Sequence, residues 1–152
     1  MIEDYIEYVS LKRKELGGHA ICAFAKPFLD KIEIIESEDF WADAIKCIDN
    51  KNHPMLYLIY GDKENYDIDW LRRFCSIHEK YARDKDLWLI WDHPDQVNKI
   101  NGIKTSNDKY AILFIQGLSE LNKYSDSLHK TDYYSFWDKE YYKEIVTDRK
   151  KS

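Results

Sequence analysis

Two carboxylates and a histidine directly follow an apolar run in the middle of the chain. The segment Leu87 to Asp95 has the sequence Leu-Trp-Leu-Ile-Trp-Asp-His-Pro-Asp. A carboxylate that orients an imidazole can make it a general base near neutral pH. The segment therefore predicts His93 as a catalytic acid or base that Asp92 or Asp95 orients. The alternative is an ordinary turn, because turn chemistry alone favours these residue types.

The apolar run itself predicts a strand with both faces buried. Alternate residues of Leu87 to Trp91 point to opposite sides of such a strand, and all of them are bulky. In open α/β sheets, ligands bind beyond the carboxyl ends of the strands. Asp62 follows a second apolar run, Met55 to Tyr60. We expect Asp62 to bind a ligand at the same edge of the sheet as the Asp-His-Pro-Asp turn.

Helical and strand patterns alternate through the first part of the chain. They predict helices over 2–16, 38–49 and 68–83, the last two capped by Ser37 and Asp67, and strands over 31–36, 55–60 and 87–91. Connections of this length imply parallel pairing and right-handed crossovers. We therefore expect a single α/β domain over 1–152, with a small, mainly parallel sheet of three or four strands covered by helices, followed by C-terminal helices.

The second part of the chain has weaker patterns. Residues 96 to 109 are polar, and a loop in this place could close over a substrate as a lid. Tyr110 to Gln116 fits a strand or a helix, and the helical spacing that continues past Gly117 to Tyr124 favours a helix. Thr131 is expected to cap a last helix that carries several aromatic residues.

Cys22 and Lys26 form a second group with chemical potential. Lys26, His19 or a helix N-terminus could lower the pKa of the Cys22 thiol and make it a nucleophile, with Lys26 as a ligand-binding residue. The apolar neighbours of Cys22 favour the alternative, a small core residue. Cys47 and Cys75 lie on apolar helix faces and are expected in the core.

Two residue pairs have spacings that chelate zinc in other proteins. They are His19 with Cys22, and Cys75 with His78. Zinc motifs normally place a tight cysteine pair in a loop, whereas Cys75 and His78 fit a buried helix face. The His-Pro-Asp stretch also matches the start of an iron-binding facial triad, whose usual host is a β-rich barrel. We therefore expect no metal site.

The cysteine and histidine segments also match stretches of other proteins. Ile21 to Lys26 has the sequence Ile-Cys-Ala-Phe-Ala-Lys, and a later stretch is His-Pro-Asp. They resemble the Leu-Cys-Pro-Phe-Ala-Lys and Phe-His-Pro-Asp segments of a family of small uncharacterised bacterial proteins, a domain of unknown function. The resemblance implies an α/β fold over most of the chain. It directs attention to Cys22, Lys26 and His93 without implying a reaction.

Composition and charge exclude several classes of partner. The 152 residues include 23 basic and 28 acidic side chains, interspersed along the chain, for a formal net charge of -5. Such a surface attracts neither nucleic-acid phosphates nor anionic lipid, so we expect no nucleic-acid and no membrane partner. The start of the chain lacks a signal-peptide pattern, which predicts a cytoplasmic protein. Richness in Lys, Ile, Asn, Asp and Tyr suits an AT-rich genome such as that of a phage or a small-genome bacterium.

Two functional hypotheses follow. The sequence contains no G-x-G-x-x-G, P-loop or G-x-S-x-G motif and so specifies no cofactor. We expect a small-molecule-binding protein or a small-molecule enzyme that uses the Asp-His-Pro-Asp site. The alternative is a non-catalytic protein-interaction module, of phage origin on compositional grounds, that acts through the aromatic C-terminal helix. There Tyr134 and Tyr142 lie off the apolar stripe and could contact a second copy or a protein partner.

Overall fold

The computed structural model describes residues 2–96 and 98–150, which form two compact units. The sheet unit comprises Asp30–Gln96 and Ser106–Ser119. The terminal unit comprises the described parts of Met1–Leu29, Val97–Thr105 and Glu120–Ser152. Each unit has its own hydrophobic cluster, and each is described by itself. That residues 1–152 form one domain is still a prediction.

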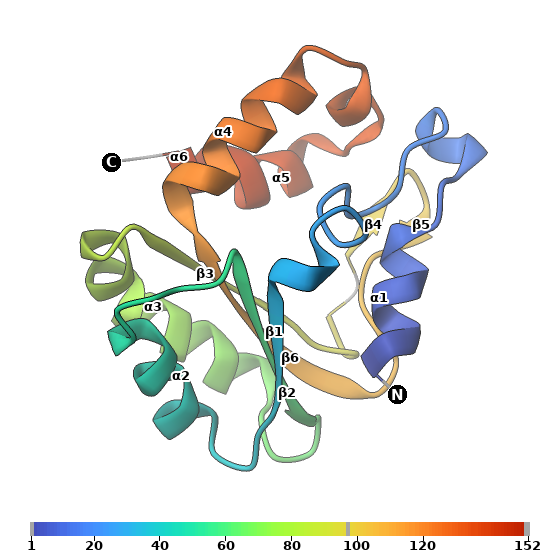
Figure 1. Ribbon diagram of the computed structural model, residues 1–152. Coiled ribbons are helices and arrows are strands. Elements are labelled where there is room, and N and C mark those ends of the chain that lie inside the picture. Colours follow the sequence, from blue (N-terminus) through green and yellow to red (C-terminus); the bar gives the residue numbers. More distant parts are fainter. Residues whose placement is uncertain (1, 97, 151–152) are drawn as a thin grey trace. The chain divides into compact units, whose positions relative to one another are not determined.

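The sheet unit contains a four-stranded sheet in the order β1-β2-β6-β3 (Figure 1). Its strands are β1 (Ile32–Glu36), β2 (Leu56–Asp62), β3 (Leu87–Asp92) and β6 (Tyr110–Gly117). The first two strands pair in parallel, whereas β6 is antiparallel to both of its neighbours. The sheet is therefore mixed. The α/β class is confirmed, but the expectation of a mainly parallel sheet was wrong.

The segment that overturns the parallel sheet is β6. Its residues Ala111, Leu113 and Ile115 belong to the core cluster, and Ile112 on the opposite face is fully buried. A strand buried on both faces is a continuous apolar run, and such a run contains helical spacings by default. The preference for a helix over Tyr110 to Gln116 was wrong for this reason.

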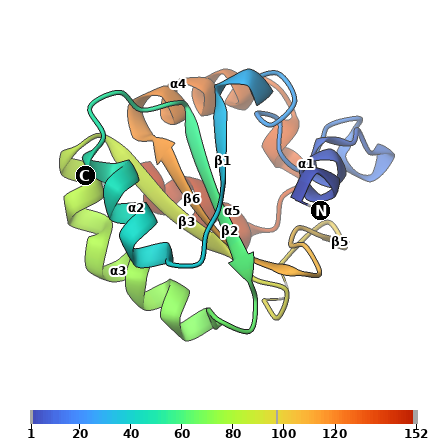
Figure 2. The same cartoon turned by 60° about the horizontal axis from the view of Figure 1, so that its bottom comes forward.

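Two helices lie side by side against one face of the sheet (Figure 2). They are α2 (Phe40–Asp49) and α3 (Ile68–Asp84). The Asp67 carboxylate caps α3 by accepting a hydrogen bond from the Trp70 amide at 2.8 Å, as predicted. The cap of α2 is Asp39 rather than Ser37, because the Asp39 carboxylate accepts the Ala42 amide at 3.1 Å.

Short helices and a hairpin make up most of the terminal unit. The predicted helix over 2–16 is two helices, α1 (Ile2–Ser10) and the 3-10 helix η1 (Lys14–Leu16). Gly17 ends η1 with a φ of 63°. The ring of Phe136 lies 2.5 Å from where a Cβ of residue 17 would be, so glycine also admits this contact.

The C-terminal helices are confirmed, but they are short. The 3-10 helix η2 (Leu29–Lys31) and α4 (Leu118–His129) each contain residues of both units. The single last helix expected after Thr131 is instead a series of four: η3 (Tyr133–Phe136), α5 (Lys139–Tyr142), the π-helix η4 (Lys143–Thr147) and α6 (Asp148–Lys150). The Thr131 hydroxyl accepts the Tyr133 amide at 3.1 Å at the start of this series.

The segment expected to be a polar lid contains a β-hairpin. Strands β4 (Lys99–Ile100) and β5 (Ile103–Lys104) are joined by Asn101 and Gly102, both with positive φ. This is the geometry of a two-residue type I′ turn. Ile100 is fully buried in the cluster of the terminal unit, so the hairpin is anchored there. Val97, within the same expected loop, lies outside the described residues.

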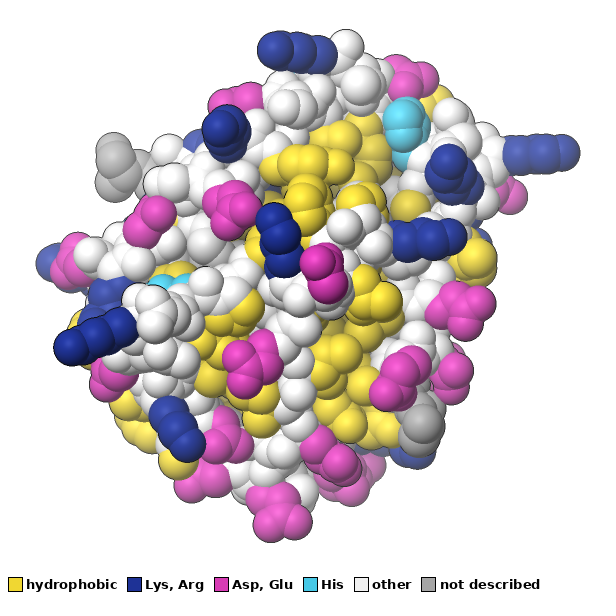
Figure 3. Space-filling view, in the orientation of Figure 1, with side chains coloured by type: hydrophobic (Ala, Val, Ile, Leu, Met, Phe, Trp, Pro, Cys, Tyr) yellow, Lys and Arg dark blue, Asp and Glu magenta, His cyan; other side chains and the backbone are white. Residues whose placement is uncertain are grey.

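The surface in Figure 3 shows acidic and basic side chains interspersed, with hydrophobic side chains between them. None of the helices in residues 2–96 and 98–150 is long and apolar enough to cross a membrane.

Candidate functional site

The carboxyl ends of β2 and β3 lie at the same edge of the sheet, with the start of β6 between them. In the register with β6, Asp62 is opposite Tyr110 and Asp92 is opposite Ile112. Both strands are antiparallel to β6 and therefore parallel to each other. The predicted edge exists, but a whole strand separates Asp62 from Asp92.

The Asp92 carboxylate organises the turn that precedes β6. Asp92 is buried, and its Oδ2 atom accepts hydrogen bonds from the backbone and side-chain nitrogens of Asn107 at 3.3 and 3.4 Å. Asn107 also donates to the Tyr110 carbonyl at 2.9 Å and accepts the amides of Lys109 and Tyr110. A structural role therefore accounts for this carboxylate.

His93 has both ring nitrogens bound to the backbone. Only 2% of the residue is exposed. Nδ1 accepts the Asp95 amide at 3.1 Å, and Nε2 lies 3.2 Å from the Lys63 carbonyl, to which it must donate. These partners define the neutral imidazole with its proton on Nε2. The catalytic role of Asp92, His93 and Asp95 stays a prediction, and the geometry favours the turn alternative.

Cys22 and Lys26 belong to the terminal unit, whereas Asp62, Asp92, His93 and Asp95 belong to the sheet unit. Burial raises the pKa of the Cys22 thiol, although hydrogen bonds from the backbone of Phe24 and Ala25 oppose the shift. This direction is opposite to the one that a nucleophilic thiolate needs. The Lys26 side chain is exposed.

The other two thiols are also held in the protonated form. Burial raises the pKa of Cys47 to about 11 and that of Cys75 to about 12, and neighbouring acidic residues add to both shifts. Cys47 lies in the core cluster of the sheet unit and Cys75 packs against it.

Within residues 2–96 and 98–150, neither zinc-like pair is part of a larger ligand set. His78 packs against the rings of Trp41 and Phe74, with centroids at 4.7 and 4.4 Å. The part of the chain that the structure describes contains no group of three or more His, Cys, Asp or Glu side chains that could hold a metal ion.

The two tyrosines expected to contact a partner make hydrogen bonds inside the terminal unit. The Tyr134 hydroxyl lies 2.7 Å from Ser125 Oγ, and the Tyr142 hydroxyl lies 2.6 Å from His129 Nε2. Both side chains are half-buried. Their polar ends therefore already have partners, and the protein interface through them stays a prediction.

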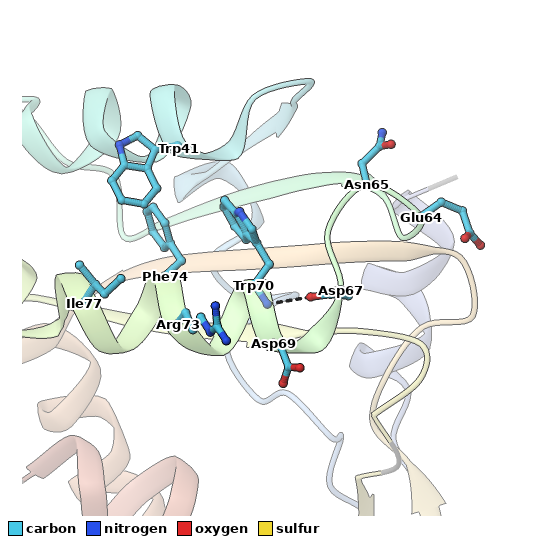
Figure 4. A pocket seen from close by; sticks show the side chains of 9 residues that line it. All are labelled: Trp41, Glu64, Asn65, Asp67, Asp69, Trp70, Arg73, Phe74 and Ile77. Atoms are coloured by element: carbon cyan, nitrogen blue, oxygen red, sulfur yellow. Dashed lines mark hydrogen bonds between the residues drawn. The ribbon is translucent and has the colours of Figure 1, made fainter.

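A pocket of about 510 Å³ lies between α2, α3 and the loop that joins β2 to α3 (Figure 4). Trp41 of α2 and Trp70 and Phe74 of α3 point into the space between the helices (Figure 4). The Trp41 and Phe74 rings meet edge to face at 5.3 Å, and Trp70 stacks on Phe74 at 5.3 Å. The rest of the lining is polar apart from Ile77; it consists of Glu64, Asn65, Asp67, Asp69 and Arg73.

Two lining residues that the apolar patterns place in the core are exposed. Trp41 is 47% exposed and Ile77 is 65% exposed. The sequence does carry a signal for this surface. The apolar face of α3 is wider than a helix needs to cover one face of a sheet. Large apolar side chains beside a hollow are a typical feature of binding surfaces.

Comparison of the chain with family models, curated proteins and solved structures gave no match. The resemblance to the uncharacterised bacterial family therefore stays a prediction. Function rests on the chemistry of the site itself.

Proposed function

We propose that this protein binds a small organic molecule in the pocket lined by Trp41, Trp70 and Phe74. The observation that carries the proposal is an exposed tryptophan, 47% accessible, beside a hollow of about 510 Å³. Ligand pockets are typically roughly 300–1,000 Å³ and combine aromatic walls with a few polar groups. This pocket has both features.

The pocket walls are held in place by their own contacts. Trp70 packs against Tyr66 and Phe40, with ring centroids at 4.8 and 6.0 Å. The Tyr66 hydroxyl accepts the Phe40 amide and donates to the Glu38 carbonyl, both at 3.0 Å. A wall that is already ordered loses little conformational entropy when a ligand binds, which favours affinity.

The ligand is of the class expected from the sequence, a small molecule, but the pocket lies away from the Asp-His-Pro-Asp turn. Binding at the strand edge would require groups that are free to meet a ligand. His93 instead uses both ring nitrogens for backbone partners, and Asp92 binds Asn107. We therefore favour a binding protein over an enzyme that uses His93.

A fragment screen by two-dimensional NMR tests the proposal. We expect fragments with a flat apolar body to shift the indole N–H signals of Trp41 and Trp70 and the amides of residues 64–77. Trp41→Ala should weaken binding by about tenfold, because aromatic anchors dominate such sites. Leu11→Ala is a matched control, since Leu11 is an exposed apolar residue, 49% accessible, of the terminal unit.

Three results would contradict the proposal. Fragments could fail to bind, could shift signals elsewhere only, or could bind Trp41→Ala as tightly as the unchanged protein. The first of these would favour the other expected class, a protein-interaction module.

A further inference from the structure

The charges around the pocket are unbalanced. Glu64, Asp67 and Asp69 contribute three carboxylates to the lining, and Arg73 contributes the single cation among these described residues. The Asp67 carboxylate caps α3 and Asp69 lies in its first turn, where negative charge complements the helix dipole; Asp69 Oδ1 is also 3.5 Å from the Arg72 guanidinium. The Asp67 carboxylate keeps its negative charge at the pocket, whereas Arg72 partly offsets that of Asp69 through an exposed ion pair.

Glu64 has no such structural role. It lies in the loop before α3, where its backbone amide donates to Asp62 Oδ1 at 2.9 Å. Within residues 2–96 and 98–150, no hydrogen bond or ion pair involves the Glu64 carboxylate. This carboxylate is therefore free to turn toward a ligand.

The aromatic walls favour the same sign of ligand charge. The face of an indole or phenyl ring carries the negative part of its quadrupole and attracts cations, tryptophan most strongly. The exposed Trp41 and the half-buried Trp70 thus act in the same direction as the carboxylates, whereas the Phe74 ring is buried against Trp70 and His78. An anion would meet repulsion from both, and attraction from Arg73 and from Arg72 beside Asp69.

We propose that the pocket binds an organic cation, an ammonium group carried on a small apolar body. The inference rests on the proposed function and specifies its ligand class. The rings exclude water from one side of the cation, and the carboxylates at the rim neutralise its charge. The positive charge of Arg73 repels a cation. The site is therefore restricted to ligands whose contacts with the aromatic rings outweigh this repulsion.

Choline and its uncharged counterpart 3,3-dimethylbutan-1-ol are suitable probes, because they share a shape and differ in charge. We expect choline to bind about tenfold more tightly, as measured by NMR titration of the Trp41 and Trp70 indole signals. Equal or weaker binding of choline than of the alcohol would overturn the inference.

A pair of charge variants gives a test by sign. Glu64→Gln should weaken choline binding by about twofold to threefold, and Arg73→Gln should strengthen it by a similar factor. High salt should reduce both effects, because it screens exposed charges. Both side chains are exposed, so the fold should persist, which circular dichroism checks. Effects of the opposite sign on choline binding, or no effect from either variant, would show that these two charges do not help the pocket to recognise a cation. Either result overturns the inference.

The two proposals fail in different ways. If fragments of any charge shift the indole signals of Trp41 and Trp70 while choline binds no better than the alcohol, the binding pocket stands and the cation class is wrong. If no fragment reaches these signals, the proposed function itself is wrong.

Discussion

The backbone amide of Asp95 donates a hydrogen bond to Nδ1 of His93 across 3.1 Å, so the two residues are joined through the main chain of Asp95. The Asp95 carboxylate is 3.8 Å from the same nitrogen and its side chain is 73% exposed. These contacts fit a turn that the imidazole stabilises better than a catalytic base that the Asp95 carboxylate orients.

His93→Ala should therefore destabilise the protein. It leaves the Asp95 amide and the Lys63 carbonyl without their partner, which costs about 1–3 kcal/mol of unfolding free energy. Asp95→Asn is the matched control and should change stability by less than about 0.5 kcal/mol, because the exposed carboxylate contributes little. Urea unfolding measures both. A His93→Ala protein as stable as the unchanged one would contradict the structural role.

The second prediction concerns the hairpin in the segment expected to be a lid. Ile100 is fully buried, so Ile100→Ala should cost about 2–5 kcal/mol of unfolding free energy. Lys99→Ala, one residue away on an exposed side chain, should be within about 0.5 kcal/mol of the unchanged protein. If both variants change the unfolding free energy by a similarly small amount, the hairpin is not anchored by Ile100. A role for this segment as a lid would then be favoured again.

The third prediction concerns thiol reactivity. Burial raises the pKa of Cys22, Cys47 and Cys75, so little thiolate is present near neutral pH. Alkylation by iodoacetamide should be slower at all three than at a free thiol, and unfolding in urea should remove the difference. Mass spectrometry of the digested protein assigns the rates. Fast labelling of Cys22 in the folded protein would restore its nucleophilic role.

The fourth prediction is a pH dependence that originates at His78. Burial lowers the pKa of His78, and its Nε2 atom is buried without a partner in the described part of the chain. Above the ordinary value of about 6.5, His78 is neutral in both states. As the pH falls further, the unfolded state takes a proton that the folded state resists. The unfolding free energy therefore decreases as the pH falls from the ordinary pKa of His78 to its lowered pKa.

His78→Phe keeps a ring between Trp41 and Phe74 and removes the ionisable group. Its stability relative to the unchanged protein should rise as the pH is lowered from about 7.5 to about 5.5. Urea unfolding at both values measures this difference. A difference that stays constant, or shrinks at low pH, would show that His78 does not titrate in this way.

Features with a local cause could be predicted from the sequence. Asp67 precedes Trp70 by three residues, and capping needs nothing more distant. Strands β2 and β3 are apolar runs bounded by polar or rigid residues, and both were predicted. The Asp-His-Pro-Asp stretch was correctly placed at the end of a strand for the same reason.

Features that depend on distant partners were decided by the tertiary structure. Strand β6 lies between β2 and β3 because pairing depends on which strand edges are available, and apolar periodicity does not encode that. The role of His93 depends on the carbonyl of Lys63, which is thirty residues earlier in the chain. Trp41 lines the pocket because α3 covers only part of its indole ring. Local chemistry determined which side chains were available, and long-range packing decided which of them are buried with partners and which stay exposed beside the pocket.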